Sequence, residues 1–457
     1  MSLTSSARLL RARLPGVAGK AFGNSGVLFG TQIVQALLRF ASFPVVAYYV
    51  DPADYGVMLA VGSLTLTLAF LSETGGAPFT VRTDGGDTPR SLNTVWTVSV
   101  IRGVLIALVL FASAPLVGDV LEEPRVTQAL RICAFGTLLF ECRALGPFLA
   151  QRYQNERRNA LVRLGTAVVA LGVQVALAVW LRDWRALAWG LVASNTLAFL
   201  ASFAFYPTRH RFALNRDVLL ALWRFSRMIA ASSAVTLVVM QFDKYVILAV
   251  ASLTVAGLFN NASNLIGIAE DLIHRHARGV FLPAAAARLR RGERSPDVFY
   301  HPLRLVRPML LLLCCVGITA GPAAIDVLLP PRYAGVGFFL SLLSLRAALM
   351  TIAQPQAAFL LADDGQRQVF YADAARLGWT VAVGLAGILA FGVNGLVLAV
   401  ALREVPPIVI QARALSARGV FSLRREASLV PVAALGLGLG AVLSLGVAAT
   451  GLGALFV

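Results

Sequence analysis

Charged side chains are scarce in this chain. Only 14% of its 457 residues are Asp, Glu, Lys or Arg, and 58% are hydrophobic, whereas about a quarter of the residues of a soluble domain are charged. Lysine is almost absent, because Lys20 and Lys244 are the only two, so arginine carries most of the net charge of +17. This composition excludes an ordinary soluble fold and predicts that most of the chain lies inside a bilayer.

Residues suited to metal, redox or covalent chemistry are equally scarce. The four cysteines lie in apolar stretches, without CxxC spacing and without a histidine pattern beside them: Cys133, Cys142, Cys314 and Cys315. Such isolated cysteines predict free thiols and exclude a disulfide framework or a zinc site. We therefore expect no metal ion, no cofactor and no catalytic residue.

Long apolar runs make up most of the chain. A run of about 20 residues crosses roughly 30 Å of hydrocarbon as an α-helix, and these runs lack the alternating polarity of transmembrane strands. The sequence predicts an all-α protein with spanning helices at about residues 24–50, 56–80, 92–118, 128–150, 160–181, 185–206, 226–251, 255–282, 306–329, 335–361, 376–393, 394–412 and 428–456.

The connections between these runs alternate in charge. One set is rich in arginine, as at 152–158, 209–216 and 288–294, while the other is short and acidic or neutral, as in Asp51-Pro-Ala-Asp54. Since basic loops remain in the cytoplasm, we expect the N-terminus and the arginine-rich connections there. The positive charge then reflects topology, and we expect no nucleic-acid partner.

The two halves of the chain share a junction pattern. The segment Val50–Gly56 joins the first two predicted helices, and Ala251–Gly257 joins the seventh and eighth in the same way. We interpret this as two parallel six-helix repeats with a site between them. The predicted domains are an amphipathic cytoplasmic segment at 1–23, lobes at 24–215 and 216–415, and a basic loop with an extra transmembrane helix at 416–457.

These junctions also carry a resemblance to a known family. Asp51-Pro-Ala-Asp-Tyr-Gly56, followed by an apolar helix and Arg82, resembles the opening of the polysaccharide transporters, or oligosaccharide flippases. Phe242-Asp-Lys-Tyr-Val-Ile-Leu248, then Ala256-Gly-Leu-Phe259, is similar to the start of that family's second lobe. The basic loop Gln154-Asn-Glu-Arg-Arg158 fits as well, and the resemblance covers about residues 20–415.

The resemblance implies a V-shaped fold of the multidrug/oligosaccharidyl-lipid/polysaccharide (MOP) exporter superfamily. It also implies a flippase that moves a polyprenyl-pyrophosphate-linked oligosaccharide across the bacterial inner membrane, for O-antigen, capsule or exopolysaccharide. The implied partners are this lipid-linked oligosaccharide, membrane lipids, a polysaccharide polymerase and glycosyltransferases. Members usually have 12 or 14 spans, so the thirteen predicted here depart from the pattern.

Polar side chains inside the predicted spans are the candidate site. The first helix places Gln32, Gln35 and Arg39 on one face, and the eighth carries a polar stripe from Asn260 to Arg278. We expect arginines to grip the pyrophosphate through paired N–H donors and amides to meet sugar hydroxyls. The predicted substrate-binding residues are Arg39, Gln32, Gln35, Asn260, Asn264, Arg275, Arg278, Arg346 and Gln354.

Carboxylates in the spans suggest energy coupling. Glu73, Glu270 and Asp271 are the candidates for carrying a coupling proton or Na⁺. The alternative is that the buried charges form ion pairs that fix helix register, for example Glu73 with Arg39 or Asp271 with Arg275.

Two other functions compete with a flippase. A cation-coupled multidrug exporter of the same superfamily should line its cavity with carboxylates and aromatic rings, whereas arginine prevails here. A polytopic glycosyltransferase or polymerase needs positioned acids or metal ligands on an extracytoplasmic face. The expected outward connections are only a few residues long and hold no clustered acid pair with room for substrate, so we do not expect an enzyme.

Overall fold

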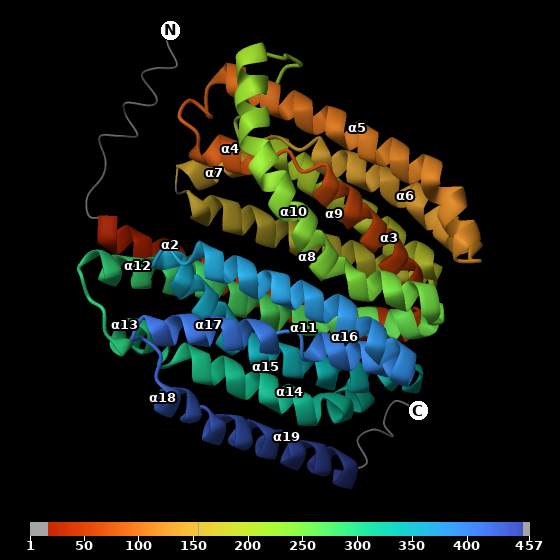
Figure 1. Cartoon of the computed structure of the whole chain (residues 1–457). Coiled ribbons are helices and arrows are strands. Elements are labelled where there is room, and N and C mark those ends of the chain that lie inside the picture. The colour runs from red at the N-terminus through yellow and green to blue at the C-terminus, as the bar shows by residue number, and fades with distance from the viewer. Residues whose placement is uncertain (1–16, 154, 451–457) are drawn as a thin grey trace.

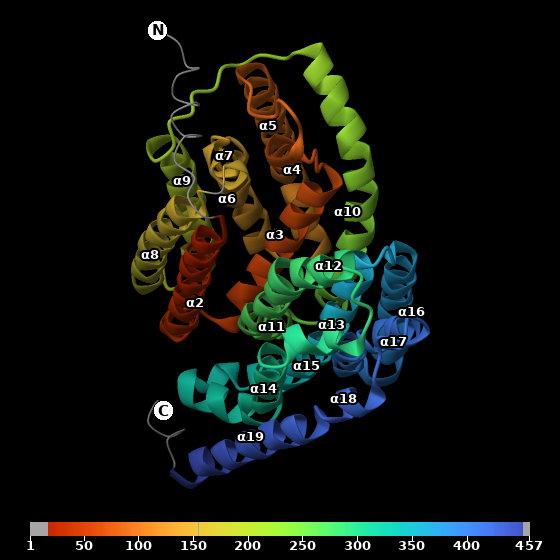
Figure 2. The same ribbon diagram turned by 90° about the vertical axis from the view of Figure 1, so that its left-hand side faces the viewer.

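The protein is a bundle of helices in two lobes (Figures 1 and 2). A computed structural model describes residues 17–153 and 155–450, and these residues form no strand, so the all-α prediction is confirmed. Of the predicted amphipathic segment, residues 1–16 lie outside the described residues. The first lobe consists of α2 (Val17–Tyr49), α3 (Pro52–Leu71), α4 (Gly76–Arg82), α5 (Pro89–Val120), α6 (Pro124–Glu141), α7 (Gly146–Arg152), α8 (Glu156–Leu181) and α9 (Trp184–Ala204).

The second lobe repeats this arrangement, and one further long helix follows it. The lobe contains α10 (Arg216–Val250), α11 (Leu253–Arg275), the π-helix η1 (His276–Phe281), α12 (Leu282–Arg290), α13 (Pro296–Tyr300), η2 (His301–Leu303), α14 (Val306–Leu328), η3 (Pro331–Tyr333), α15 (Gly335–Ala362), α16 (Gln366–Ala401) and α17 (Val405–Ala417). The short α18 (Leu423–Ala427) leads into α19 (Val430–Thr450), which packs along α14.

The two ends of the bundle differ in their connections. The arginine-rich connections at 152–158, 207–215 and 288–305 lie at one end, on the left in Figure 1, and we call this the basic end. The short connections at 50–51, 121–123 and 251–252 lie at the opposite end, which we call the short-loop end. The ribbons of the two lobes converge toward the short-loop end, which gives the V shape of the fold.

Capping residues start the helices where the chain turns. Asn215 accepts hydrogen bonds from the backbone N–H groups of Asp217 and Val218, and the Ser252 hydroxyl accepts one from Val255. These bonds satisfy N–H groups that the first turn leaves free, worth about 1 kcal/mol each. Pro52 stands at the first position of α3, where a backbone N–H would have no partner within the helix, and proline has no such group. The short connections therefore define the ends of the helices closely.

Several predicted spans are broken in the structure. The span predicted at 56–80 is divided into α3 and α4 by Gly75, whose φ of 63° is left-handed. The span predicted at 128–150 is divided into α6 and α7, which are bent by 45°. The chain reverses at Gly392, with φ 61°, between the spans predicted at 376–393 and 394–412, near the short-loop end. The span predicted at 255–282 continues through η1 into α12.

Eight helices among the described residues are long and apolar enough to span a membrane, or nine if the bent pair α6–α7 counts as one span. The predicted thirteen spans therefore stay a prediction, as do the predicted domain boundaries. Helices α2, α10 and α11 occupy the places of predicted spans but fall outside this count. Helix α10 contacts α3 of the first lobe and α16 of the second, and α11 packs on α3.

The lobes meet where the two repeated junctions cross. A Cβ atom on Gly56 would lie 2.0 Å from the carbonyl oxygen of Leu253, and one on Gly257 would lie 1.7 Å from that of Pro52. Any side chain at either position would collide with the backbone of the opposite lobe. The predicted repeats therefore pair with each other through their glycines, and this contact holds α3 against α11 at the short-loop end.

Candidate functional site

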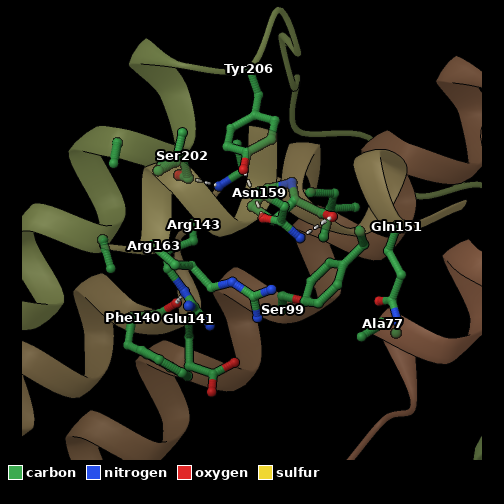
Figure 3. A pocket seen from close by; sticks show the side chains of 18 of the residues that line it. Ala77, Ser99, Phe140, Glu141, Arg143, Gln151, Asn159, Arg163, Ser202 and Tyr206 are labelled. Carbon is green, nitrogen blue, oxygen red and sulfur yellow. Dashed lines mark hydrogen bonds between the residues drawn. The ribbon is translucent and has the colours of Figure 1, made fainter. Parts of the chain in front are cut away.

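A large polar cavity lies in the first lobe, toward the basic end. It has a volume of about 430 Å³, and helices α3 to α9 all contribute to its wall. Figure 3 shows Glu141, Arg143 and Arg163 gathered at one side, with Asn159 and Tyr206 at another. The Tyr206 hydroxyl donates to the Asn159 side-chain oxygen at 2.7 Å. The lining thus combines guanidinium groups with neutral hydrogen-bonding groups.

Arg102 of α5 organises the wall of this cavity. Its Nη1 donates to Glu141 of α6 at 3.1 Å, and its Nη2 lies 3.8 Å from Glu73, just after α3. The same guanidinium donates to the Ala69 carbonyl and to the Ser72 hydroxyl. Because one buried cation holds the ends of both broken helices, the ion pairs fix the shape of the cavity.

Side chains satisfy the backbone groups that the α6–α7 break leaves free. Trp96 donates from Nε1 to the Cys142 carbonyl at 3.2 Å. His210, from the connection between α9 and α10, accepts a hydrogen bond at Nε2 from the Leu145 N–H at 3.1 Å and stacks on Trp96. Burial lowers the pKa of His210 below its usual 6.5, which keeps the ring neutral and able to accept.

A second, smaller cavity lies between the lobes. It has a volume of about 70 Å³, and its polar lining comes from Gln35 and Arg39 of α2 and from Asp271 and Arg275 of α11. The sequence predicted all four of these side chains as site residues, and the structure brings them together. Asp271 and Arg275 lie 4.0 Å apart on one face of α11, which confirms that predicted pair.

The rest of the predicted stripe follows α11 along the bundle. Near the short-loop end, Asn260 donates to the Tyr55 carbonyl of the opposite lobe at 3.3 Å. Asn264 is exposed, and so is Arg278, which projects from the π-helix η1. The side chain of Gln32 lies outside the described residues.

Two predicted site residues lie inside the second lobe instead. Arg346 of α15 is 7% exposed, and its Nη2 lies 2.6 Å from Glu270 of α11. No carboxylate lies one turn away on its own helix, but α11 supplies one from across the lobe. Gln354 is buried on the same helix. This arrangement favours a structural role for Arg346 over contact with a ligand.

The suggested pairing of Glu73 with Arg39 is wrong. Glu73 also accepts a hydrogen bond from the Gly75 N–H at 2.8 Å, and its ion-pair partner is Arg102. The break after α3 turns Glu73 toward α5 and away from α2.

A further ionic network in the second lobe joins α16 to α17. Arg376 donates to both carboxylate oxygens of Glu404, at 3.1 and 2.9 Å, and also contacts Asp373. Glu404 is 3% exposed, so its charge is neutralised inside the protein. Beside it, Arg403 donates to the Val239 carbonyl of α10.

The short-loop end is closed by polar contacts between the lobes. Arg332 of η3 donates to the carbonyls of Ala47 and Tyr48 at the end of α2, at 3.0 and 2.7 Å, and its Nε lies 3.1 Å from Asp51. The Tyr333 hydroxyl donates to the Val50 carbonyl at 2.6 Å. We call this set of contacts the Arg332 clamp.

Apart from Glu73, sequence reasoning missed the charged residues around the larger cavity. Arg102 lies ten residues inside an apolar run, and a lone arginine at that depth is itself a signal of function or pairing. Glu141 and Arg143 stand at the end of another run, directly before the Gly146-Pro147 pair that signals a break. These signals could have located the cavity wall, but not its ion pairs.

Two lobes of helices, many of them long and apolar enough to span a membrane, enclose a polar and arginine-bearing space at one end and meet at the other, and this fold is shared with solved membrane transporters. The fold is similar to that of a solved lipid II flippase, MurJ, in an inward closed conformation, with a TM-score of 0.70, 11% identity and 93% coverage of both chains. It is also similar to an inward-facing multidrug resistance MATE family transporter of the MOP superfamily, with a TM-score of 0.65 and 13% identity over 86% of this chain and 98% of the other.

Within this class, the model of a polysaccharide biosynthesis protein family matches residues 45–336, and the chain belongs to that family. It is 25% identical over 322 residues to the succinoglycan biosynthesis transport protein ExoT of Rhizobium meliloti (strain 1021). That match covers 69% of this chain and 63% of the relative's length. The resemblance noted in the junction motifs is thus confirmed at the level of this family, and the fold is similar to that of solved MOP-superfamily transporters.

Proposed function

We propose that this protein flips a polyprenyl-pyrophosphate-linked oligosaccharide across the bacterial inner membrane by alternating access, with its basic end in the cytoplasm. The observation that carries the proposal is that Arg39 of α2 and Arg275 of α11 line the same cavity between the lobes. Two guanidinium groups on facing helices suit a pyrophosphate, which offers several oxygens to paired N–H donors.

The larger cavity supports the same substrate class. It lies on the first-lobe side, toward the basic end, and its amide and hydroxyl groups suit sugar hydroxyls. Exposed apolar side chains cover the outer faces of the helices, so a polyprenyl tail can remain in the bilayer while the headgroup enters. The family's role in polysaccharide biosynthesis, and the transport role in the name of the Rhizobium relative, agree with such a substrate.

The test measures flipping of a fluorescent lipid-linked oligosaccharide in proteoliposomes. We expect Arg39→Ala and Arg275→Ala each to lose at least 90% of the flipping rate. Such a tenfold loss corresponds to about the free energy of one charged hydrogen bond. Arg290→Ala, at an exposed arginine of α12, is the matched control and should keep the wild-type rate. Full activity in both cavity variants would disprove the cationic site, provided that all variants insert and express equally.

We also propose that an ion gradient drives the cycle. Among the candidates, Glu73 is best placed, because its carboxylate is partly exposed at the larger cavity and shares Arg102 with Glu141. Arg102 lies closer to Glu141, at 3.1 Å, than to Glu73, at 3.8 Å, so Glu73 is the more weakly paired of the two carboxylates. We expect flipping to stop when all gradients are collapsed, and Glu73→Gln to flip at a rate insensitive to the gradient. Undiminished flipping without any gradient would refute the coupling.

A further inference from the structure

A third pocket lies at the basic end, apart from both cavities described above. It has a volume of about 350 Å³, and its walls are the segment around α13 and η2, the start of α14, and the α18–α19 junction. Four basic side chains line it: His301, Arg304, Arg307 and Arg425. Segments more than 100 residues apart in the sequence therefore meet to form one basic pocket.

The walls of this pocket are held rigidly. Arg307 is 4% exposed, and its two terminal nitrogens donate to the two carboxylate oxygens of Glu426 at 3.1 and 2.5 Å. Arg425 donates to Asp297 at 2.7 Å. The Tyr300 hydroxyl accepts from the Ser422 N–H at 3.1 Å. These contacts tie α18 to α13 and α14, so the pocket is preformed.

The pocket keeps donors that the protein itself does not satisfy. Within the part of the chain that the structure describes, the guanidinium of Arg304 makes no hydrogen bond and no ion pair, although its backbone N–H donates to the His301 carbonyl. The Nε of Arg307 is buried and has no partner either. A buried N–H group without an acceptor is costly. An anion with several oxygens would meet both needs.

Apolar side chains adjoin the same pocket. Leu305 and Met309 at the start of α14 are 82% and 61% exposed, and Val430 at the start of α19 is 65% exposed. The arginines therefore stand where two apolar helices emerge from a basic connection. This is the level at which phospholipid phosphates lie in a bilayer, and basic pockets between helices bind lipid headgroups there.

We propose that this pocket binds the phosphate of an anionic phospholipid of the surrounding bilayer. Arg304 and Arg425 grip the phosphate oxygens, and the acyl chains lie along the exposed apolar side chains of α14 and α19. A bound lipid would join α18 and α19 to the second lobe. The inference rests on the membrane placement of the fold and not on the flipping substrate.

The test is a titration of the purified full-length protein, in neutral detergent, with short-chain phosphatidylglycerol. Arg304→Gln should weaken binding about tenfold. Without lipid its unfolding temperature should match the wild type, because the substitution breaks no hydrogen bond and no ion pair of the Arg304 guanidinium within the described residues. Arg424→Gln removes the same charge from α18 outside the pocket and is the matched control. Its affinity should stay at the wild-type value.

Other ligands distinguish a phospholipid from the other possible sources of the bound phosphate. Short-chain phosphatidylcholine should bind at least tenfold more weakly than phosphatidylglycerol, and inorganic phosphate should not displace the bound lipid at equal concentration. Equal losses in Arg304→Gln and Arg424→Gln would overturn the proposal, because they would show a general surface-charge effect. Displacement by inorganic phosphate, or tighter binding of a polyprenyl pyrophosphate, would also overturn the assignment to a phospholipid.

Discussion

At the scale of single residues, Arg102 has the largest electrostatic task in the first lobe. It neutralises Glu141, whose side chain is 11% exposed, and it also holds the end of α3. Arg102→Gln should lower the free energy of unfolding by about 3–5 kcal/mol, because it leaves a buried carboxylate without its partner. Thermal unfolding in detergent measures this loss.

A second variant distinguishes the ion pair from packing. In the double variant Arg102→Gln with Glu141→Gln, only the partly exposed Glu73 is left without its partner, so we expect recovery of more than half of the lost stability. Arg290→Gln, at an exposed position, should change stability by less than about 0.5 kcal/mol. Additive losses in the double variant would show that the charge pair is not what matters.

His210 makes the stability of the first lobe depend on pH. Its pKa is lowered in the folded protein, so as the pH falls below about 6.5 the unfolded chain binds a proton that the folded chain excludes. The stability that neutral His210 contributes is thus present above pH 6.5 and is lost as the pH falls through the folded pKa. Protonation would also turn Nε2 from an acceptor into a donor facing the Leu145 N–H.

The variant His210→Gln keeps an acceptor for Leu145 but does not titrate near neutral pH. We expect its unfolding temperature to change less than that of the wild type between about pH 7.5 and 5.5. His301→Gln, at an exposed histidine of η2, serves as the control and should keep the wild-type profile. Identical profiles for wild type and His210→Gln would contradict the assigned role.

At the scale of elements, the sequence predicted the positions of most helices, because apolar runs and their capped, short connections both mark them. The breaks were harder to predict. Gly75 and Gly146-Pro147 are local signals of a helix break, yet an apolar run continues through both. A run long enough to cross the bilayer is therefore predicted as one unbroken span. The ion pairs could not be predicted, since Arg102 meets carboxylates 29 and 39 residues away on helices whose rotations only packing decides.

Contacts within one helix were easier. The pair of Asp271 with Arg275 follows from their i, i+4 spacing, and the α11 stripe follows from helical periodicity. Arg346 shows the limit, because its partner Glu270 stands beside the polar stripe on α11 but points into the lobe. Sequence spacing gives the face of a helix, whereas the neighbour on that face comes from the tertiary fold.

The extra helix α19 packs on α14 through two glycines one turn apart, Gly436 and Gly440. A Cβ on Gly440 would lie 2.1 Å from the Thr319 Oγ1 and 2.7 Å from the Val316 carbonyl oxygen, whereas Gly438, on the same helix, has nothing within 4 Å. Gly440→Leu should therefore cost about 1–3 kcal/mol of stability through overpacking. Gly438→Leu is the control and should unfold like the wild type, and equal effects at both sites would contradict close packing of α19.

At the scale of the whole molecule, the closed end is the part that must change if the lobes rock. The Arg332 clamp and the crossing of Gly56 with Gly257 join the lobes at the short-loop end. The clamp uses hydrogen bonds and a partly exposed ion pair, which water can replace at modest cost. The glycine crossing is a backbone contact without side chains to disengage. Both features suit an interface that opens and closes.

A cross-link across this interface tests alternating access directly. In a background without the four native cysteines, Asp51→Cys and Arg332→Cys face each other from the two lobes, and a short bis-thiol reagent should join them. We expect the cross-link to stop flipping in proteoliposomes and a reductant to restore it, because the short-loop end can then no longer open. The uncross-linked pair should flip lipid, since the clamp contributes only a small part of the stability.

The matched control places the same cross-link at the same end but inside one lobe. Asp54 and Arg125 form an ion pair at 3.0 Å between α3 and α6, both of the first lobe. Joining Asp54→Cys to Arg125→Cys should leave flipping unchanged, because lobes that move as rigid bodies keep this distance fixed. If both cross-links stop flipping, the lobes themselves deform during transport. If neither does, the short-loop end stays closed throughout, and the substrate must leave by a route between helices of a single lobe.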